Sequence, residues 1–433
     1  MLEIISTKET ERLKLKLQRI RGRNVALDSE LLARVAAIIE DVHSNGDQAL
    51  VKFAACFDGL ELEPADLLIG REELEKSAWQ ADQSFVDALR EAIKRVRTFH
   101  EFERQHSWDF ETDNGSRLGQ RISAIDSAGV YVPGGTASYP SSVVMNVVPA
   151  QVAGVDRIIV ASPPRSIREN PAIAAALIEL GVTEIYGVGG AQAIAALAYG
   201  TETVPRVDKI TGPGNRYVAA AKKLVFGVCG IDSIAGPTEV IILADDTAPA
   251  SFIAGDLLAQ SEHGEDASAV LLTTSKILAK TVADAVSKQI GSLSRKEIIE
   301  KSLADYGAII VVSDLVEACA LVNDLAPEHL EIICRDSEEI ASRIRHAGAI
   351  FLGQYSPEVV GDYIAGPNHV LPTAGTARFS SALGVHDFLK RTSLLKFSAS
   401  ELRTTAPLID ALARAEGLDA HARSAKIRLE AER

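Results

Sequence analysis

Apolar side chains recur at helical spacing through much of the first hundred residues. Between residues 29 and 103, positions such as Leu31 and Val35 repeat every three or four residues, which is typical of amphipathic helices. A second helical run covers residues 72–104. The run Asn45-Gly46-Asp47 interrupts the first pattern and predicts a turn inside this region, with no domain boundary there.

The pattern changes at Val130, where short apolar runs begin to alternate with helical stretches. In this part we expect strands at 157–161, 184–188 and 208–211, and helices at 172–180, 191–198 and 216–225. Strands that alternate with helices of this length favour a parallel sheet covered by helices on its faces.

A second alternating series starts near Glu239. Its predicted strands are 240–244, 269–273, 308–312 and 349–352, and its predicted helices are 250–262, 276–289 and 315–325. After Ser380 the pattern is mainly helical and ends in a charged helix over residues 419–432. The sequence therefore predicts an α/β fold with two Rossmann-like parallel-sheet domains in tandem and helical N-terminal and C-terminal extensions.

Length, charge and apolar content exclude several classes of protein. A chain of 433 residues exceeds what one core usually serves, so at least two domains are expected. The formal net charge of -14 disfavours nucleic acid and anionic lipid as partners. No long apolar stretch and no signal-peptide pattern occur, so we expect a cytoplasmic protein without a membrane span.

Cysteine usage fits a reducing compartment. No two cysteines form a C-x-x-C pair, and two of them lie within apolar runs; the four are Cys56, Cys229, Cys319 and Cys334. We therefore expect reduced cysteines, without a disulfide framework or a cysteine-zinc site.

Two glycine-containing loops follow predicted strands and open predicted helices. The first reads GVGGAQ at 187–192, where Gln192 replaces the third glycine of the usual dinucleotide fingerprint. The second reads TGPGN at 211–215. Backbone N–H groups at such junctions bind phosphate, although the same glycines also serve simply to make tight turns. No G-K-[ST] follows, which disfavours a P-loop enzyme.

Residues with metal-ligand chemistry lie in three separate segments. Gln260 and His263 are three residues apart at a helix end, so both side chains leave one face. The alternative is that His263 only satisfies the last carbonyls of that helix. Zinc takes about four donors, so Asp362 and His421 are candidates for the remaining two.

An acid and an imidazole stand next to each other at Glu328 and His329, directly after Pro327. Such a pair offers two proton acceptors of different strength in one place. Surface capping is an equally simple explanation of the pair from its spacing alone.

Several segments, in this order and at these separations, resemble the histidinol dehydrogenase family along essentially the whole chain. The matching segments are YVPGG at 131–135, VGGAQAIAAL at 188–197, GPGN at 212–215, AGPTE at 235–239, QSEHG at 260–264, PEHL at 327–330 and NHVLPT at 368–373.

The resemblance assigns roles to individual residues. It implies that zinc is bound by Gln260, His263, Asp362 and His421. It implies that Glu328 and His329 are the catalytic bases and that NAD is contacted by Tyr131, Gln192 and Asn215. It implies that the substrate is held by Thr238, His329 and Glu416 together with the metal ligands. Many family members carry serine where this chain has Thr238; because the hydroxyl is kept we expect little change in function, although the added methyl could narrow the pocket.

The resemblance also implies a reaction, an assembly and a domain organisation. The reaction is the two-step oxidation of L-histidinol through its aldehyde to L-histidine with two NAD and one water. The assembly is a homodimer in which the C-terminal tail is exchanged, so that His421 and Glu416 come from the partner. The expected divisions are an N-terminal arm (1–28), a zinc-binding catalytic domain (29–130 plus 239–380), an NAD-binding domain (131–238) and the exchanged tail (381–433).

Three alternatives differ in chemistry. A relative on this scaffold could oxidise another small polar alcohol such as a sulfonated diol, although Glu416 would repel a sulfonate. A zinc hydrolase could use Glu328 to activate water without any nucleotide. A non-catalytic binding protein would have no use for complete sets of ligands and bases.

Overall fold

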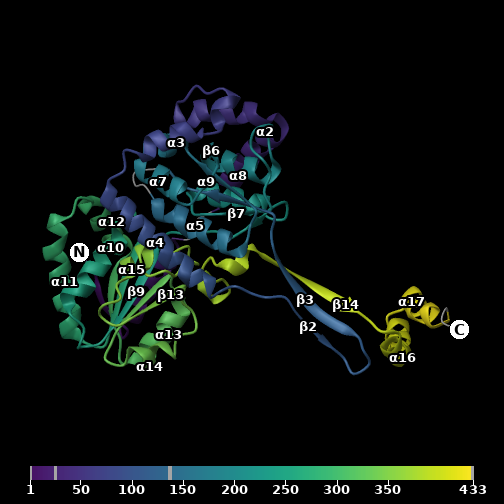
Figure 1. Cartoon of the computed structure of the whole chain (residues 1–433). Coiled ribbons are helices and arrows are strands. Elements are labelled where there is room, and N and C mark those ends of the chain that lie inside the picture. Colours follow the sequence, from purple (N-terminus) through teal and green to yellow (C-terminus); the bar gives the residue numbers. More distant parts are fainter. Residues whose placement is uncertain (1, 24–26, 135–138, 431–433) are drawn as a thin grey trace.

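Two parallel sheets and one antiparallel sheet organise the chain (Figure 1). The computed structural model describes residues 2–23, 27–134 and 139–430. Gly135, the last residue of the YVPGG segment, lies outside the described residues, as do the final residues of the tail.

The first parallel sheet has five strands in the order β6-β5-β4-β7-β8. Its strands are β4 (Ser127–Tyr131), β5 (Arg157–Ser162), β6 (Glu184–Gly187), β7 (Lys209–Thr211) and β8 (Gly230–Ile231). The three predicted strands of this region are confirmed, whereas β4 was not predicted. The apolar pattern of β4 is weak because Gly129 cannot carry a larger side chain: a Cβ there would come within 3.1 Å of Leu197. This buried strand therefore needs a small residue at that position.

Helices cover both faces of the five-stranded sheet. One face is covered by α2 (Ser29–Phe53), α8 (Gly190–Tyr199) and α9 (Arg216–Val225), which pack together. The other face is covered by α3 (Arg71–Ala78), α4 (Gln83–Glu101), α5 (Pro140–Ala153) and α7 (Pro171–Glu179). Alternate residues of β5 join the two cores: Ile159 lies in the first and Val160 in the second. Helices α2, α3 and α4 belong to the predicted catalytic domain, yet they pack on the sheet of the predicted NAD-binding domain.

The predicted turn at Gly46 is present as a break within α2. Gly46 has a φ of 52°, in the left-handed region that favours glycine. The two helical halves continue on either side of it.

The second parallel sheet has six strands in the order β1-β11-β10-β9-β12-β13. They are β1 (Ile4–Ser6), β9 (Glu239–Ala244), β10 (Ser268–Thr273), β11 (Ala308–Val311), β12 (His329–Ile333) and β13 (Ala349–Leu352). Helices α10 (Ala250–Ser261), α11 (Lys276–Gln289) and α13 (Leu315–Leu325) confirm the predicted helices. The N-terminal arm supplies the edge strand β1.

A long antiparallel arm leads away from both parallel sheets (Figure 1). It consists of β2 (Trp108–Glu111), β3 (Arg117–Ala124) and β14 (Leu389–Lys396), and at its far end lie α16 (Ala399–Ala415) and α17 (Asp419–Glu430). The expectation of a mainly helical segment after Ser380 is therefore wrong for β14. Seven of the eight β14 residues are exposed, so no buried face marks this strand in the sequence.

In the part of the chain that the structure describes, none of the helices combines the length and the apolar character that crossing a membrane requires.

Candidate functional site

Polar side chains gather at the amino edge of the six-stranded sheet. Thr238 directly precedes β9 and Glu328 directly precedes β12, and these strands are parallel neighbours. The register therefore places the two side chains next to each other. The Thr238 hydroxyl donates to Glu328 Oε2 (2.6 Å), which also accepts from the N–H of Glu239 (2.9 Å).

Burial sets the proton affinity of Glu328. Loss of hydration raises the pKa of its carboxyl to about 7, against the opposing hydrogen bonds from Thr238 and Glu239. Asp362 adds a smaller contribution in the same direction. A carboxyl with this pKa can act as a general base near neutral pH.

His329 is held as a neutral imidazole. Its Nδ1 lies 3.2 Å from the carbonyl oxygen of Glu239, so Nδ1 carries the hydrogen and Nε2 keeps its lone pair. Burial lowers the pKa of His329. The imidazole is thus ready to accept a proton at Nε2. The Glu328 carboxyl lies 3.7 Å from its Nδ1, so the two predicted bases form one site.

Three of the four predicted metal ligands converge beside these bases. His263 Nε2 lies 3.9 Å from Asp362 Oδ2. A further carboxyl, Glu358, lies 4.0 Å from His263 Nε2, and the ligating atoms of these three residues are all within 4.8 Å of one another. The amide of Gln260, which is fully buried, contacts Glu358 at 2.9 Å.

Glu358 was not among the predicted residues. It lies in the short helix α15 (Glu358–Tyr363), four residues before Asp362. The only signal in the sequence was this spacing, which places two carboxyl groups on one helical face. Such spacing is common on solvated helices, so it did not single out the residue.

The fourth predicted ligand is not brought to this site within one chain. His421 and Glu416 are exposed. His421 lies in α17 and Glu416 directly follows α16, the two helices at the far end of the arm (Figure 1). The structure therefore brings Gln260, His263 and Asp362 together but leaves the tail residues apart.

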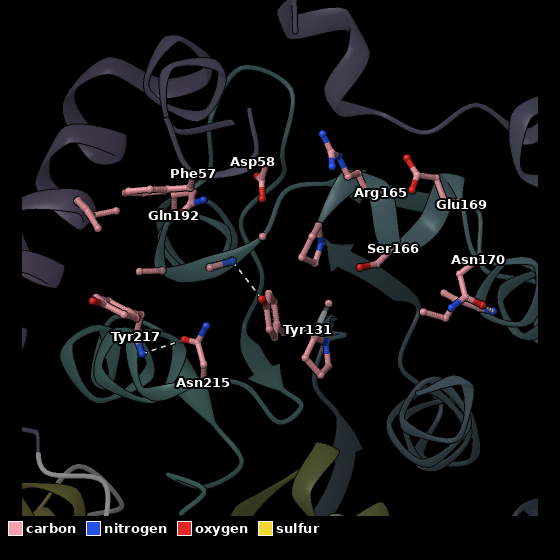
Figure 2. A pocket seen from close by; sticks show the side chains of 18 of the residues that line it. Phe57, Asp58, Tyr131, Arg165, Ser166, Glu169, Asn170, Gln192, Asn215 and Tyr217 are labelled. Atoms are coloured by element: carbon pink, nitrogen blue, oxygen red, sulfur yellow. Dashed lines mark hydrogen bonds between the residues drawn. The ribbon is translucent and has the colours of Figure 1, made fainter. Parts of the chain in front are cut away.

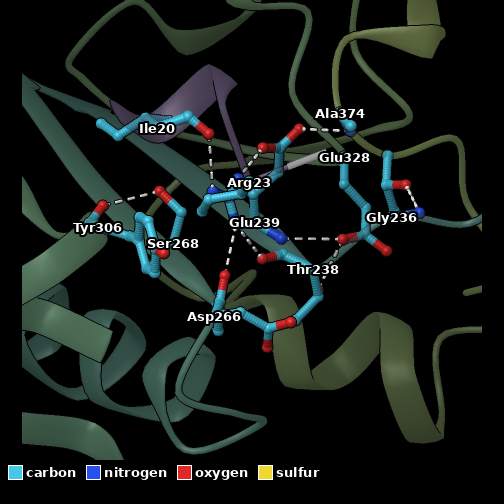
Figure 3. A network of polar contacts seen from close by, with 12 residues as sticks. Ile20, Arg23, Gly236, Thr238, Glu239, Asp266, Ser268, Tyr306, Glu328 and Ala374 are labelled. Carbon is cyan, nitrogen blue, oxygen red and sulfur yellow. Dashed lines mark hydrogen bonds and ion pairs between the residues drawn. The ribbon is translucent and has the colours of Figure 1, made fainter. Parts of the chain in front are cut away.

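A buried ion pair supports the backbone of the bases (Figure 3). The Arg23 guanidinium pairs with the carboxylate of Glu239 and donates to the carbonyl oxygens of Thr238 (3.1 Å) and Asp266 (2.9 Å). The N–H of Ala374 donates to the other Glu239 oxygen (3.0 Å). Because Glu239 supplies the N–H to Glu328 and the carbonyl to His329, these contacts fix both bases. No local pattern in the sequence indicated this role for Arg23.

A separate cavity of about 1170 Å³ lies at the carboxyl edge of the five-stranded sheet (Figure 2). Tyr131, Gln192 and Asn215, the predicted NAD contacts, all line it. They come from β4, α8 and the start of α9, where parallel α/β sheets bind nucleotides. Arg34, together with residues 57–58, also lines the cavity, so α2 and the turn after it help to form it.

Hydrogen bonds orient the cavity wall. The Tyr131 hydroxyl accepts from the N–H of Gly190 at the start of α8 (3.0 Å). Burial raises the pKa of Tyr131 to about 12, so the phenol stays protonated. The Asn215 side chain accepts from the N–H of Tyr217 (2.9 Å) and caps α9.

Glycine is required at position 212, where the loop of residues 211–215 passes close to the end of β4. Gly212 has a φ of 113°, and a Cβ there would lie 2.1 Å from the carbonyl oxygen of Tyr131. The close approach places Asn215 beside Tyr131 in the cavity wall. This loop therefore has a specific geometry beyond that of a simple tight turn.

Comparison with known proteins identifies the family. The sequence profile of histidinol dehydrogenase matches residues 22–429. The chain belongs to the histidinol dehydrogenase family. It is 55% identical over 395 residues to histidinol dehydrogenase of Bacillus subtilis (strain 168), covering 91% of this chain and 92% of that protein. The corresponding protein of Geobacillus kaustophilus is 50% identical over 423 residues, covering 96% and 99%.

A solved structure confirms the fold. The crystal structure of histidinol dehydrogenase from Elizabethkingia anophelis matches with a TM-score of 0.89 and 35% identity, covering 93% of each chain. Membership of the histidinol dehydrogenase family makes this chain an NAD-dependent oxidoreductase of histidine biosynthesis.

The Gly212 geometry predicts the effect of one added methyl group. Gly212→Ala should displace the loop from Tyr131 and weaken NADH binding, measured by fluorescence titration, by at least about tenfold, since steric clash and backbone strain each cost about 1–3 kcal/mol. Gly227→Ala is the matched control, because Gly227 also has a positive φ but has no atom within 4 Å of an added Cβ. Equal effects of both substitutions would contradict a role for the close approach.

Proposed function

We propose that this chain oxidises L-histidinol to L-histidine in two NAD-dependent steps in the cytoplasm, with one water added between them. The observation that carries the proposal is the pair of buried proton acceptors, Glu328 and His329, beside a cluster of metal-ligating side chains. Family membership and the nucleotide cavity support the same chemistry.

The first step needs a base for the alcohol proton. As a hydride leaves the carbon for NAD, the O–H proton must also leave, and the free Nε2 of His329 is suited to accept it. The Glu239 carbonyl that holds Nδ1 stabilises the imidazolium that results. The product is the aldehyde.

The second step needs water. Glu328 is suited to remove a proton from a water molecule as its oxygen attacks the aldehyde carbon. The aldehyde oxygen gains a proton as the water adds, which gives a hydrate with two O–H groups. Its carbon loses a second hydride to a second NAD while an O–H proton passes to His329, and the carboxylic acid that results releases its remaining proton to form the carboxylate. Burial of both bases keeps bulk water away from the aldehyde.

The donor set of the cluster fits zinc. Imidazole nitrogen and carboxylate oxygen are preferred zinc ligands, and His263 and Asp362 supply both within the site. Burial, and then the neighbouring carboxyl groups, raise the pKa of Glu358 there, and a divalent cation would relieve this. We assign zinc to Gln260, His263, Asp362 and His421. When bound, zinc would act mainly as a template that fixes the imidazole and amine of the substrate.

The remaining substrate contacts follow from charge and shape. Thr238 lies against Glu328 and limits the space beside it. Glu416 would receive the substrate amine as a charge-assisted partner. Glu416 and His421 reach a site only if the tail belongs to a second subunit.

The exposed tail supports a homodimer with exchanged tails. Helices α16 and α17 pack on each other at the end of the arm, away from both parallel sheets of their own chain (Figure 1). Large apolar side chains remain exposed there, including Leu408 (63%) and Leu412 (68%). A surface of this kind is expected to be covered by a partner.

Glu328→Gln tests whether Glu328 and His329 serve different steps of the reaction. Oxidation of histidinol to the aldehyde should persist, while oxidation of supplied aldehyde falls by about 10²–10⁴-fold, because water loses its base. In the unsubstituted protein, aldehyde oxidation should rise with pH through about 7, as Glu328 ionises. Stopped-flow NADH absorbance measures both steps. Equal losses in the two steps would refute the assignment of Glu328.

Mixing two inactive variants tests whether the tail is exchanged between subunits. His421→Asn should release zinc and abolish turnover. His329→Ala should abolish turnover because the base that accepts the alcohol proton is lost. If tails are exchanged, mixed dimers contain one intact site, so random reassociation should restore about a quarter of the activity. If each tail serves its own chain, every site keeps one defect and the mixture stays inactive.

A further inference from the structure

A buried ion pair lies beside the loop of residues 211–215. Lys222 belongs to α9 and Asp232 directly follows β8, and their side chains are only 3% and 5% exposed. The Lys222 ammonium pairs with Asp232 Oδ1. A buried ion pair is often no more stabilising than an apolar pair of similar volume. The further contacts of these two side chains therefore indicate their role.

Both side chains also bind the backbone of Gly212. The Gly212 N–H donates to Asp232 Oδ2 (2.8 Å), and the Lys222 ammonium donates to the Gly212 carbonyl oxygen (3.0 Å). The other carboxylate oxygen, Asp232 Oδ1, accepts from the N–H of Ser233 as well (2.6 Å). The ion pair therefore holds Gly212 by both of its polar backbone groups.

These two contacts fix the backbone torsions of Gly212. Its N–H and its carbonyl belong to the peptide groups on either side of one Cα, so holding both groups restricts φ and ψ together. Glycine has the widest choice of backbone conformations, and Gly212 adopts a φ of 113° that other residues rarely adopt. Gly212 is therefore the residue of the loop whose conformation most needs contacts from outside the loop.

The rest of the loop carries this conformation to the nucleotide cavity. Gly214 packs against α9, where an added Cβ would lie 2.4 Å from the Val218 side chain. Asn215 then caps α9 and lines the cavity wall (Figure 2). Because Lys222 belongs to the same helix, the ion pair joins the start of the loop to the helix that follows its end.

We propose that Lys222 and Asp232 are positioning residues of the nucleotide cavity: by holding both polar backbone groups of Gly212, they set the place of Asn215 in the cavity wall. The inference rests on the proposed contact of Asn215 with NAD. Neither member of the ion pair is among the described residues that line the cavity, so both act through the loop. Loss of the ion pair should lower the affinity for the cofactor and leave the affinity for the substrate unchanged, because the proposed substrate site belongs to the other parallel sheet.

An apolar replacement of the ion pair tests the proposal in the full-length protein. Lys222→Met with Asp232→Leu removes both contacts to Gly212 and leaves no buried charge, so the protein should still fold. The dissociation constant of NADH, measured by fluorescence titration, should rise at least about tenfold, because two buried backbone groups lose their partners. The affinity for L-histidinol without cofactor, measured by calorimetry, should change by less than about twofold, since the two sites are separate.

Lys222→Met with Asp232→Asn is the matched variant that keeps one contact. Asparagine has nearly the shape of leucine, and its oxygen can still accept from the Gly212 N–H. NADH should therefore bind at least about threefold more tightly to this variant than to the variant with Asp232→Leu. Lys209→Met is the control for loss of a cation near the loop: Lys209 begins β7 but pairs with Asp387 (3.2 Å), and NADH affinity should stay within about twofold.

A third substitution tests whether the effect passes through Asn215. Asn215→Ser shortens the side chain but keeps an oxygen that can cap α9, and it should weaken NADH binding by itself. Added to Lys222→Met with Asp232→Leu, it should weaken NADH binding further by no more than about twofold, because the loop is already displaced.

Distinct results overturn the inference. Unchanged NADH affinity in Lys222→Met with Asp232→Leu would show that the ion pair does not position the loop. Equal losses of NADH and L-histidinol affinity would show a general structural role, and fully additive effects with Asn215→Ser would show a route that bypasses Asn215. Unchanged NADH affinity in Asn215→Ser alone would reject the NAD contact on which the inference rests, while intact turnover of L-histidinol would leave the proposed reaction standing.

Discussion

The gathering of carboxyl groups out of water is the constraint on which this structure depends. Glu328, Glu331 and Glu358 are almost fully buried near the amino edge of one sheet, and Asp362 adds its charge. A cluster of buried carboxyl groups is tolerated only when hydrogen bonds, cations or bound protons compensate for the hydration that the carboxyl groups lose. The Thr238 hydroxyl, the Glu239 N–H and the Arg23 ion pair supply part of this compensation. Burial, opposed by these hydrogen bonds, leaves the pKa of the Glu328 carboxyl at about 7, which suits the proton transfer proposed for it.

The two parallel sheets divide the chemistry between opposite edges. The cavity proposed to bind NAD lies at the carboxyl edge of the five-stranded sheet, where loops and helix starts offer backbone N–H groups. The proposed bases and metal ligands lie at the amino edge of the six-stranded sheet, where strand register sets the separation of Thr238 and Glu328. A rigid sheet edge holds these side chains more closely than a long loop would. In the proposed dimer, the partner's tail then brings the last polar groups from outside.

Periodicity in the sequence located many of the buried helices and strands, because each has a continuous apolar run. It missed the buried helix α5, which contains Pro149, and the buried strand β12, whose run contains Glu331. It also missed β4, where Gly129 leaves no room for a larger side chain beside Leu197, and β14, which has no buried face. Spacing and donor chemistry singled out Gln260, His263 and Asp362 as candidates, the family resemblance gave them as zinc ligands, and the structure brings them together. Arg23 and Glu358 were missed because their roles depend on contacts between segments far apart in the chain, which no local pattern records.

The most direct test of the account is the number of NADH molecules formed for each L-histidinol consumed by the zinc-loaded protein, before and after a chelator is added. Buried bases that serve two successive oxidations predict two NADH per histidinol, with both lost after zinc removal. A ratio of one would show that the aldehyde leaves unoxidised and would contradict the role of Glu328. Full activity after complete zinc removal would contradict the role of the metal-ligating cluster.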